Sequence, residues 1–479
     1  MMQPSDVRKP SKVLKGGVVL ASTLVLCSCA PLPHKSDTAM AGARTFASAT
    51  SLSAPEKAWP SDRWWEGFGD AQLNSLIAEG LEGAMDLRVA SARFAHAEAL
   101  VQQTRSRLLP ALTTSAEVGS TKQSYNYLSP ESGLPKGWRG YGQTTIDLSW
   151  ELDFWGRNRA ALAAARSEAE AAGAEAASAR LAVSASIASA YADLAGNYAE
   201  HDAAEHAIEV RNHTLELIEG RQEQGLENEG AVERARSALA TAQGDLAALN
   251  ESLALTRNRI AALIGAGPDR GLAIKRPAAI VTGSFGLPAN LPAELIGRRP
   301  DIIAARLRAE ASASRIKEAH AAFYPNVNLA GLIGLQALGI GNVFKSGSDF
   351  GTVGPAISLP VFDGGRLRGQ YRAAETDYQA AVAQYDGALT QALRDVADAA
   401  ASSRALDLRL DHAQEAERAA NAAWIVANNR YRGGLATYLD VLAAEDALIS
   451  ARRSVASLKT RALALDIALI RALGGGYRS

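Results

Sequence analysis

The sequence predicts a mainly α-helical chain that also carries four membrane β-strands. Three observations support this fold class. One stretch, from Asn158 to about Glu219, keeps a helical pattern for about 60 residues without a proline. Four segments of about 10–12 residues alternate apolar and polar side chains, as strands with two unlike faces do. Most of this pattern is written twice along the 479 residues.

Composition excludes several classes of protein. The chain has 50 basic and 51 acidic residues, with no basic patch and no charged tail, so we expect no nucleic-acid partner. No apolar run reaches the ~18 residues that a membrane helix needs. A membrane role would therefore depend on the alternating strands.

The N-terminus predicts export. Basic residues precede an apolar run from Gly16 to Leu26, which has the form of a secretory signal. Small residues lead to Cys29, and this arrangement resembles the bacterial lipobox, which implies that Cys29 becomes the acylated mature N-terminus. Several acyl chains together anchor a protein firmly to a bilayer. The alternative is a plain signal peptide with an idle cysteine. We assign residues 1–28 to the signal and 29–60 to a Pro/Ser-rich tether.

A tandem duplication follows the tether. Gly225 aligns with Gly434, a shift of 209 positions (434 − 225), and the same shift pairs Gly156-Arg157 with Gly365-Arg366. Self-similarity over most of a chain marks an internal repeat. We assign residues 61–280 to the first repeat and 281–479 to the second.

Each repeat has the same order of elements: a helix, two strands and two long helices. Pro300 and Asp301 make a good helix start, and Asp70 is placed to cap an earlier helix. The expected short helices span about 86–108 and 300–322, and the expected strands span about 111–122, 143–154, 326–336 and 351–362.

The last long helix of each repeat has heptads. In the second repeat Val441, Leu448 and Val455 recur every seventh residue, and Ala444, Ala451 and Leu458 follow each at the fourth position of its heptad. This spacing predicts a coiled-coil seam. A second apolar stripe flanks the seam, which favours a helix that contacts two neighbours in a ring or sheet of helices.

The strand "TTIDLSWELDF" has one apolar face and one acidic face. Asp147, Glu151 and Asp153 share the acidic face. A soluble β-sandwich strand would show the same alternation, but four strands leave open edges and cannot close a barrel alone. In lipid every backbone group must be paired, so closure would have to come from two or three chains. The acids would then face a hydrated lumen.

These residues and motifs resemble the TolC-like outer membrane factors of Gram-negative efflux systems, especially their lipoprotein (NodT-type) subgroup. The resemblance is carried by "SWELDFWGR", "LPAELIGRRPDI", "FYPNVNLAG", "FDGGRLR" and "RALGGGY". It implies a homotrimer whose twelve-stranded β-barrel in the outer membrane is continued by an α-helical barrel in the periplasm. It also implies a passive duct that docks to a periplasmic adaptor and an inner-membrane pump, commonly of the resistance-nodulation-division type. The transported compounds would be drugs or other small molecules.

The resemblance also implies a gate just after the glycine break of the second repeat. Leu439 and Asp440 fall on the matching positions, Ala443 stands where relatives often carry a second aspartate, and Asp446 lies further on. The alternative for Asp440 is a solvated helix residue. For Arg298, Arg299, Pro300 and Asp301 we expect a structural role, with the proline opening a helix and the arginines pairing with acids.

No catalytic constellation is evident, so we expect no enzyme and no cofactor. His201, Glu205, His206 and Glu209 lack the spacing of a metal motif and are interpreted as a solvated helix face. Two other functions stay open: the outer membrane duct of a type I protein secretion system, and a lipid-anchored structural coiled-coil protein of the envelope. The second would leave the four strands without a role.

Overall fold

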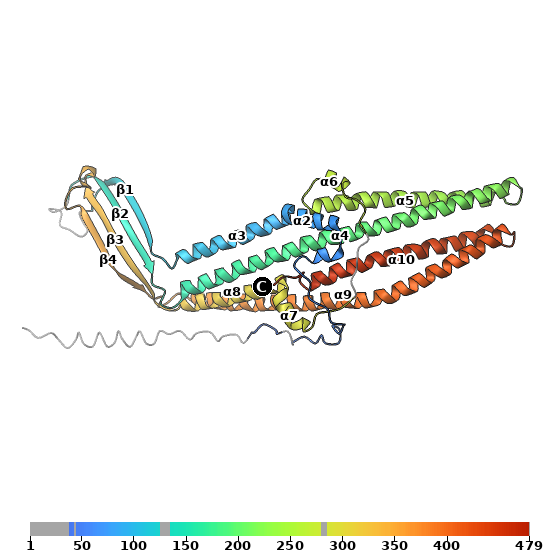
Figure 1. Cartoon of the computed structure of the whole chain (residues 1–479). Coiled ribbons are helices and arrows are strands. Elements are labelled where there is room, and N and C mark those ends of the chain that lie inside the picture. The colour runs from blue at the N-terminus through green and yellow to red at the C-terminus, as the bar shows by residue number, and fades with distance from the viewer. Residues whose placement is uncertain (1–37, 43–44, 125–134, 279–284, 479) are drawn as a thin grey trace, which may run out of the picture. The chain divides into compact units, whose positions relative to one another are not determined.

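The computed structural model describes residues 38–42, 45–124, 135–278 and 285–478. It contains two compact units (Figure 1). One unit holds the strands with the adjoining helix ends, in residues 98–168 and 308–382 together with residues 38 and 39. The other holds the remaining helices, in residues 40–97, 169–307 and 383–479. Both sequence repeats contribute to each unit, because each repeat begins and ends in helices and has its strands between them.

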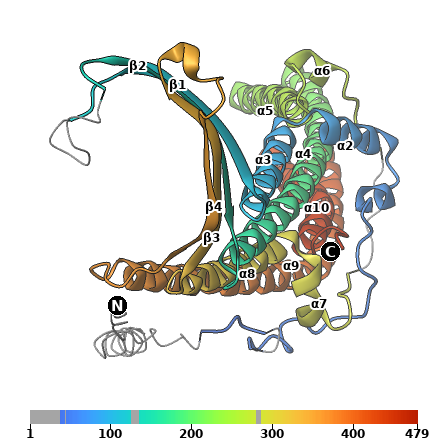
Figure 2. The ribbon, with the colours of Figure 1, turned by 90° about the vertical axis from the view of Figure 1, so that its left-hand side faces the viewer.

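The strand unit is built around one four-stranded antiparallel sheet with the order β1-β2-β3-β4. The strands are β1 (Ala111–Thr121), β2 (Arg139–Glu151), β3 (Asn326–Leu338) and β4 (Asp349–Ser358). Figure 2 shows them as one twisted, curved sheet. β1 and β4 form its edges, and neither has a second strand partner among the described residues.

The register of the sheet separates apolar from polar side chains. Ile146 lies opposite Ile333, which in turn lies opposite Gly351, so the apolar positions of neighbouring strands share one face. Large side chains on this face are exposed in the single chain, among them Leu112, Ile146, Ile333, Val353 and Ile357. The opposite face carries hydroxyl, amide and carboxylate groups, together with Leu332 and Phe350. The predicted alternation of the strands is confirmed.

Every strand differs from its predicted range at one boundary or both, and the largest differences are at the two ends of β2, which begins at Arg139, and at the end of β4. β2 ends at Glu151, before Asp153 and Phe154, although the alternation of the sequence continues through both. The chain leaves the sheet there because the Asp153 carboxylate accepts hydrogen bonds from the first amides of the next helix. β4 ends at Ser358, just before Pro360, whose ring nitrogen has no hydrogen to donate to a sheet.

Paired helices of equal length show the duplication in three dimensions. The long pairs are α4 (Arg157–Glu223) with α9 (Arg366–Arg432), 67 residues each, and α5 (Glu229–Leu263) with α10 (Tyr438–Ala472), 35 residues each. The shorter pair is α3 (Met85–Ser106) and α8 (Pro300–Ala321), 22 residues each. Short elements complete the chain: η1 (Trp64–Phe68), α2 (Ala71–Gly83), α6 (Pro268–Leu272), α7 (Leu291–Arg298) and η3 (Ile340–Asn342). None of the described helices combines the length and apolar run that a bilayer crossing needs.

The helical unit is held by its coiled-coil seams and by one larger core. Val441, Leu448 and Val455 are buried in α10, as Val232 and Ile260 are in α5, so the predicted heptads form real contacts. The larger core packs Trp64, Trp65 and Phe68 of η1 with side chains of α2 and α4, including Ile77 and Tyr191. Asp70 caps α2 as predicted, and it also accepts a hydrogen bond from the Tyr191 hydroxyl.

Candidate functional site

The helical tip is the pair of turns that join α4 to α5 and α9 to α10, and Figure 1 shows both turns at the same end of the helical unit. Each turn contains a glycine with positive φ, 72° at Gly225 and 71° at Gly434, a conformation that side chains other than glycine rarely adopt. The amides of Leu226 and Leu435 then close the two turns in the same way. The predicted breaks near Gly225 and Gly434 are confirmed.

Leu439 and Asp440 lie in the first turn of α10, with both side chains exposed. Thr437 and Asp440 form a capping box: the backbone amide and the hydroxyl of Thr437 each donate to Asp440 Oδ2 at 2.8 Å. These two hydrogen bonds hold the pKa of Asp440 below its usual value. The carboxylate therefore stays charged at the tip while it also stabilises the helix start.

Asp446 belongs to a charged cluster that the sequence did not reveal. Its carboxylate pairs with Arg211 of α4, and Arg211 also lies 3.1 Å from Glu445 Oε1 through its Nη1. Glu445 is fully buried, and its Oε2 accepts a hydrogen bond from Thr214 at 3.1 Å. Burial raises the pKa of Glu445, with Arg211 acting in the opposite direction. Glu445 follows Val441 by four residues and precedes Leu448 by three, so it shares their buried helix face beside the seam. This spacing is the sequence signal that could have predicted its burial.

Tyr431 makes a second connection between the two helical pairs at the tip. Its buried hydroxyl donates to Glu227 Oε1 at 3.1 Å, and the Arg221 guanidinium lies 4.7 Å from its ring centroid. Burial, followed by the Glu227 charge, raises the pKa of Tyr431 to about 12. Together with the Arg211 cluster, this contact ties α9 and α10 to α4 and the turn that follows it.

The strand acids lie in two different environments. Asp147 and Glu151 are in β2, on its polar face. Asp147 Oδ2 accepts a hydrogen bond from Thr145, whose hydroxyl lies 2.7 Å from that of Ser115. Asp153 lies beyond the strand, where its nearly buried carboxylate caps α4 and pairs with Arg159 at 3.2 Å.

The Arg-Arg-Pro-Asp motif lies at the start of α8. Arg299 is buried and binds Asp301 through two nitrogens, at 3.0 and 2.6 Å, and the Ala472 carbonyl at 3.1 Å. Burial alone would lower the pKa of Arg299, but Asp301 and Asp395 outweigh it and raise the pKa. Arg298 instead pairs with Glu294 and covers the Trp59 ring at 4.6 Å, and Pro300 occupies the first position of α8.

The end of α10 packs against this motif at a position that only glycine fits. Gly474 has a φ of 94°, and a Cβ added there would lie 2.3 Å from the Arg298 carbonyl oxygen. The Arg299 side chain meanwhile holds the carbonyl of Ala472. The Arg-Arg-Pro-Asp motif at the start of α8 and the glycine-containing motif after α10 are therefore in direct contact.

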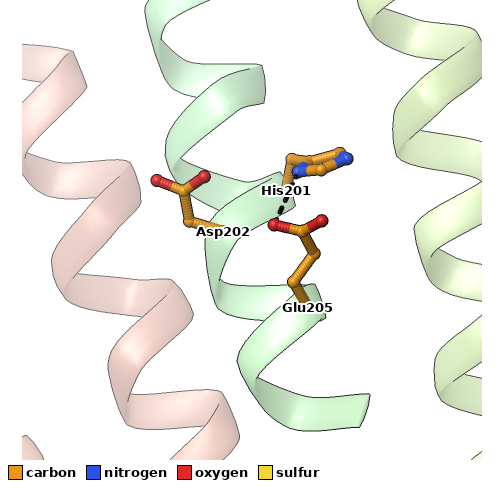
Figure 3. A group of neighbouring side chains, drawn as sticks. All are labelled: His201, Asp202 and Glu205. Atoms are coloured by element: carbon orange, nitrogen blue, oxygen red, sulfur yellow. Dashed lines mark ion pairs between the residues drawn. The ribbon is translucent and has the colours of Figure 1, made fainter. Parts of the chain in front are cut away.

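The His201 cluster on α4 is a group of potential metal ligands on a partly exposed helix face. His201, Asp202 and Glu205 bring ligand atoms within 4.8 Å of one another. Figure 3 shows the three side chains and the ion pair between His201 and Glu205. The Asp202 carboxylate, however, is engaged by two nitrogens of Arg276, and His201 Nδ1 lies 3.5 Å from Glu205. Arg276 already neutralises the Asp202 carboxylate, which leaves Glu205 as the acidic group of the cluster that is not paired with an arginine. The other sequence candidate, Cys29, lies outside the described residues.

The chain combines a four-stranded sheet, which has one apolar face, with long paired helices. This combination defines the class of outer membrane channels that are built from strands and helices. A family model described as "Outer membrane efflux protein" matches residues 76–266 and 291–475. The toluene efflux pump outer membrane protein TtgF of Pseudomonas putida is 32% identical, over 86% of this chain and 85% of TtgF. The fusaric acid resistance protein FusA of Burkholderia cepacia is 33% identical, over 74% of this chain and 68% of FusA.

Solved structures agree with the sequence comparisons. The crystal structure of the outer membrane protein VceC from Vibrio cholerae aligns with a TM-score of 0.84 and 46% identity, over 88% of this chain and all of VceC. The chain belongs to the outer membrane efflux protein family. It is an outer membrane efflux channel and not an enzyme.

Proposed function

We propose that this protein is the passive exit duct of a tripartite efflux pump of the resistance-nodulation-division type, and that it carries drugs or other small molecules to the exterior. The observation that carries the proposal is the open sheet, with one largely apolar face, one largely polar face and two edges that have no strand partner in the part of the chain that the structure describes. Backbone groups cannot stay unpaired in lipid. Three copies would place β1 of one subunit beside β4 of the next and give twelve strands.

In this assembly the apolar face meets lipid and the polar face lines a hydrated lumen. Asp147 and Glu151 then contribute acidic groups to the lumen wall, since both share the polar face of β2. Asp153 would remain near the periplasmic end of the barrel, where it caps α4. Cys29 would add acyl chains that anchor the same subunit to the outer membrane.

The helical tip is the proposed gate and docking end. Leu439 and Asp440 would narrow the opening, with Asp446 further along α10. A periplasmic adaptor and an inner-membrane pump would meet the tip and favour its open state. Such opening requires only that the partners bind one arrangement of the helices more tightly than the other.

A direct test combines assembly, conduction and export. The purified full-length protein should be a trimer in mild detergent and should form ion-conducting pores in planar bilayers. Deleting its gene should increase drug accumulation, and a plasmid copy should restore export. A protein that stays monomeric and never conducts would contradict the proposal. If it conducts but its loss affects only protein secretion, it would instead be a secretion duct.

A further inference from the structure

A groove of about 900 Å³ lies at the junction of the strands and helices, wholly within the strand unit. We call it the junction groove. Its walls come from the first turns of α4, the last turns of α8 and the first turns of α9, and Thr38 of the N-terminal segment also lines it. The residues that matter here are Trp155, Arg159, Lys317, His320, Tyr371 and Glu375. None of them belongs to the tip or to the polar face of the sheet.

One wall of the junction groove is aromatic and firmly held. Trp155 stacks on Tyr324 with ring centroids 4.7 Å apart and an angle of 19° between the planes, and its Nε1 donates to the Pro325 carbonyl at 2.8 Å. His320 lies 5.5 Å from the Tyr324 ring and 6.4 Å from the Tyr371 ring. Amphipathic rings of this kind concentrate at the level of lipid headgroups.

Charged side chains of both signs lie at the junction groove, and the two cations differ in how they are paired. Lys317 is exposed and makes no ion pair with any residue in the described ranges. Arg159 is held by Asp153 yet keeps 64% of its side chain accessible. The Glu375 carboxylate also lines the groove, but it interacts with the Tyr371 hydroxyl. Lys317 is therefore the cation that is most open to an anionic ligand, and Arg159, paired with Asp153 on one side, keeps accessible surface for a second contact.

Two large exposed apolar side chains lie near the groove residues in the sequence. Phe154, next to Trp155, is 65% exposed, and Phe362, just before α9, is 92% exposed. A soluble anion would use only the cations, whereas a lipid would also use these apolar side chains. The combination of cations, interfacial aromatic rings and exposed apolar side chains favours a lipid.

We infer that the junction groove binds the phosphate-bearing headgroup of an anionic glycerophospholipid, with Lys317 and Arg159 contacting the phosphate and Trp155 packing against the lipid. This inference rests on the proposed function, because the strands must lie in the bilayer for the groove to lie at its surface. Each lysine or arginine near an anionic membrane surface contributes enough to change affinity about fivefold.

The test measures lipid bound to the full-length protein by native mass spectrometry. Dioleoyl phosphatidylglycerol is the anionic probe and dioleoyl phosphatidylcholine is the zwitterionic reference. The wild type should retain the anionic lipid preferentially, and Lys317→Gln should reduce this preference about fivefold. Lys317→Arg should restore it. Lys345→Gln, an exposed lysine near the opposite end of the strands, is the matched control and should behave as wild type.

Four outcomes would overturn the inference. The first is equal retention of both lipids by the wild type, and the second is an equal loss of preference in Lys317→Gln and Lys345→Gln. The third is full displacement of the lipid by inorganic phosphate, which would indicate a site for soluble anions. The fourth is selective binding only after residues 30–37 are deleted, since the chain's own N-terminal segment would then be the occupant. Conductance is recorded in parallel. Trimers that conduct but show no lipid preference would contradict the lipid inference and leave the proposed function intact. Monomers that do not conduct would contradict the proposed function.

Discussion

Arg211 Nη1 lies 3.1 Å from Glu445 Oε1, and this ion pair joins α4 to α10 inside the helical unit. Glu445 has no exposed surface, and only 8% of the Arg211 side chain is accessible. Asp446 and Thr214 complete the cluster from the same two helices. A buried pair of this kind is costly to break from one side, because the remaining charge loses its partner.

Replacing the guanidinium of this pair should destabilise the helical tip strongly. Arg211→Met leaves the buried Glu445 without its cation, and such changes cost about 3–5 kcal/mol. Thermal unfolding in detergent, followed by circular dichroism, measures the loss. Arg236→Met is the control, because Arg236 is an exposed partner of Glu219 and Glu233 and should leave the transition nearly unchanged. Similar losses in both variants would show that the Arg211 cluster is not special.

Stability should depend on pH through Glu445. Burial raises its folded pKa above the unfolded value, so the folded chain holds this proton more tightly. The contribution of Glu445 to stability is therefore fully present below the unfolded pKa, and it is lost as pH rises through the folded pKa. Glu445→Gln removes the titration. As pH rises from about 4 to 8, the Tm of the wild type should fall relative to that of Glu445→Gln. A Tm difference that does not change with pH would exclude Glu445 as the source of the pH dependence.

Removing the charge of Asp440 should widen or loosen the tip. Asp440→Ala should raise single-channel conductance severalfold and increase vancomycin entry into cells. Because Asp440 also closes a capping box, part of this effect would come from a frayed helix start. Thr437→Ala separates the two causes, since it removes the hydroxyl of the box and keeps the carboxylate.

A second control for this prediction uses the duplication. Asn228 occupies the position in the first repeat that Thr437 occupies in the second, and its side chain caps α5. Asn228→Ala should lose a cap without changing any charge near Asp440. Unchanged conductance in a well-assembled Asp440→Ala trimer would remove Asp440 from the gate. Equal increases in all three variants would assign the effect to the helix caps.

The first arginine of the Arg-Arg-Pro-Asp motif should tolerate change better than the second. Arg299→Lys loses the two-nitrogen contact with Asp301 and the bond to the Ala472 carbonyl, which should cost about 1.5–3 kcal/mol. Arg298→Lys keeps a charge near Glu294 and loses mainly its contact with Trp59, so less than about 1 kcal/mol is expected. Chemical denaturation of the two variants checks the order, and a reversed order would contradict the structural role of Arg299.

Periodic features of the fold were predictable because their signal repeats along the chain. The heptads of α10 and the alternation of β2 each depend on several residues, so one exception does not hide them. The strand end at Glu151 was missed because the alternation continues through Phe154, and only the contact between Asp153 and α4 shows where the sheet stops. Local capping can end an element that periodicity alone would extend.

The tip cluster was predictable only in part. Asp446 was identified beside the gate, but its partner Arg211 lies far away in the sequence and on a different helix. Glu445 is spaced from Val441 and Leu448 so that it shares their buried helix face, yet a glutamate is usually interpreted as solvated. The pairing of charges between distant helices depends on tertiary packing, which a single sequence does not reveal. The duplication did reveal that the two turns are equivalent, because each turn is determined by residues that are close together in the sequence.

The two free edges of the sheet, β1 and β4, run antiparallel to each other because the number of strands is even. An edge-to-edge joint between copies can therefore be head-to-tail, with every subunit facing the same way. A row of subunits joined like this still has one unsatisfied edge of each kind, whatever its length. Only closure of the ring pairs both edges. An incomplete assembly therefore keeps two edges that can bind a further strand until the last subunit joins.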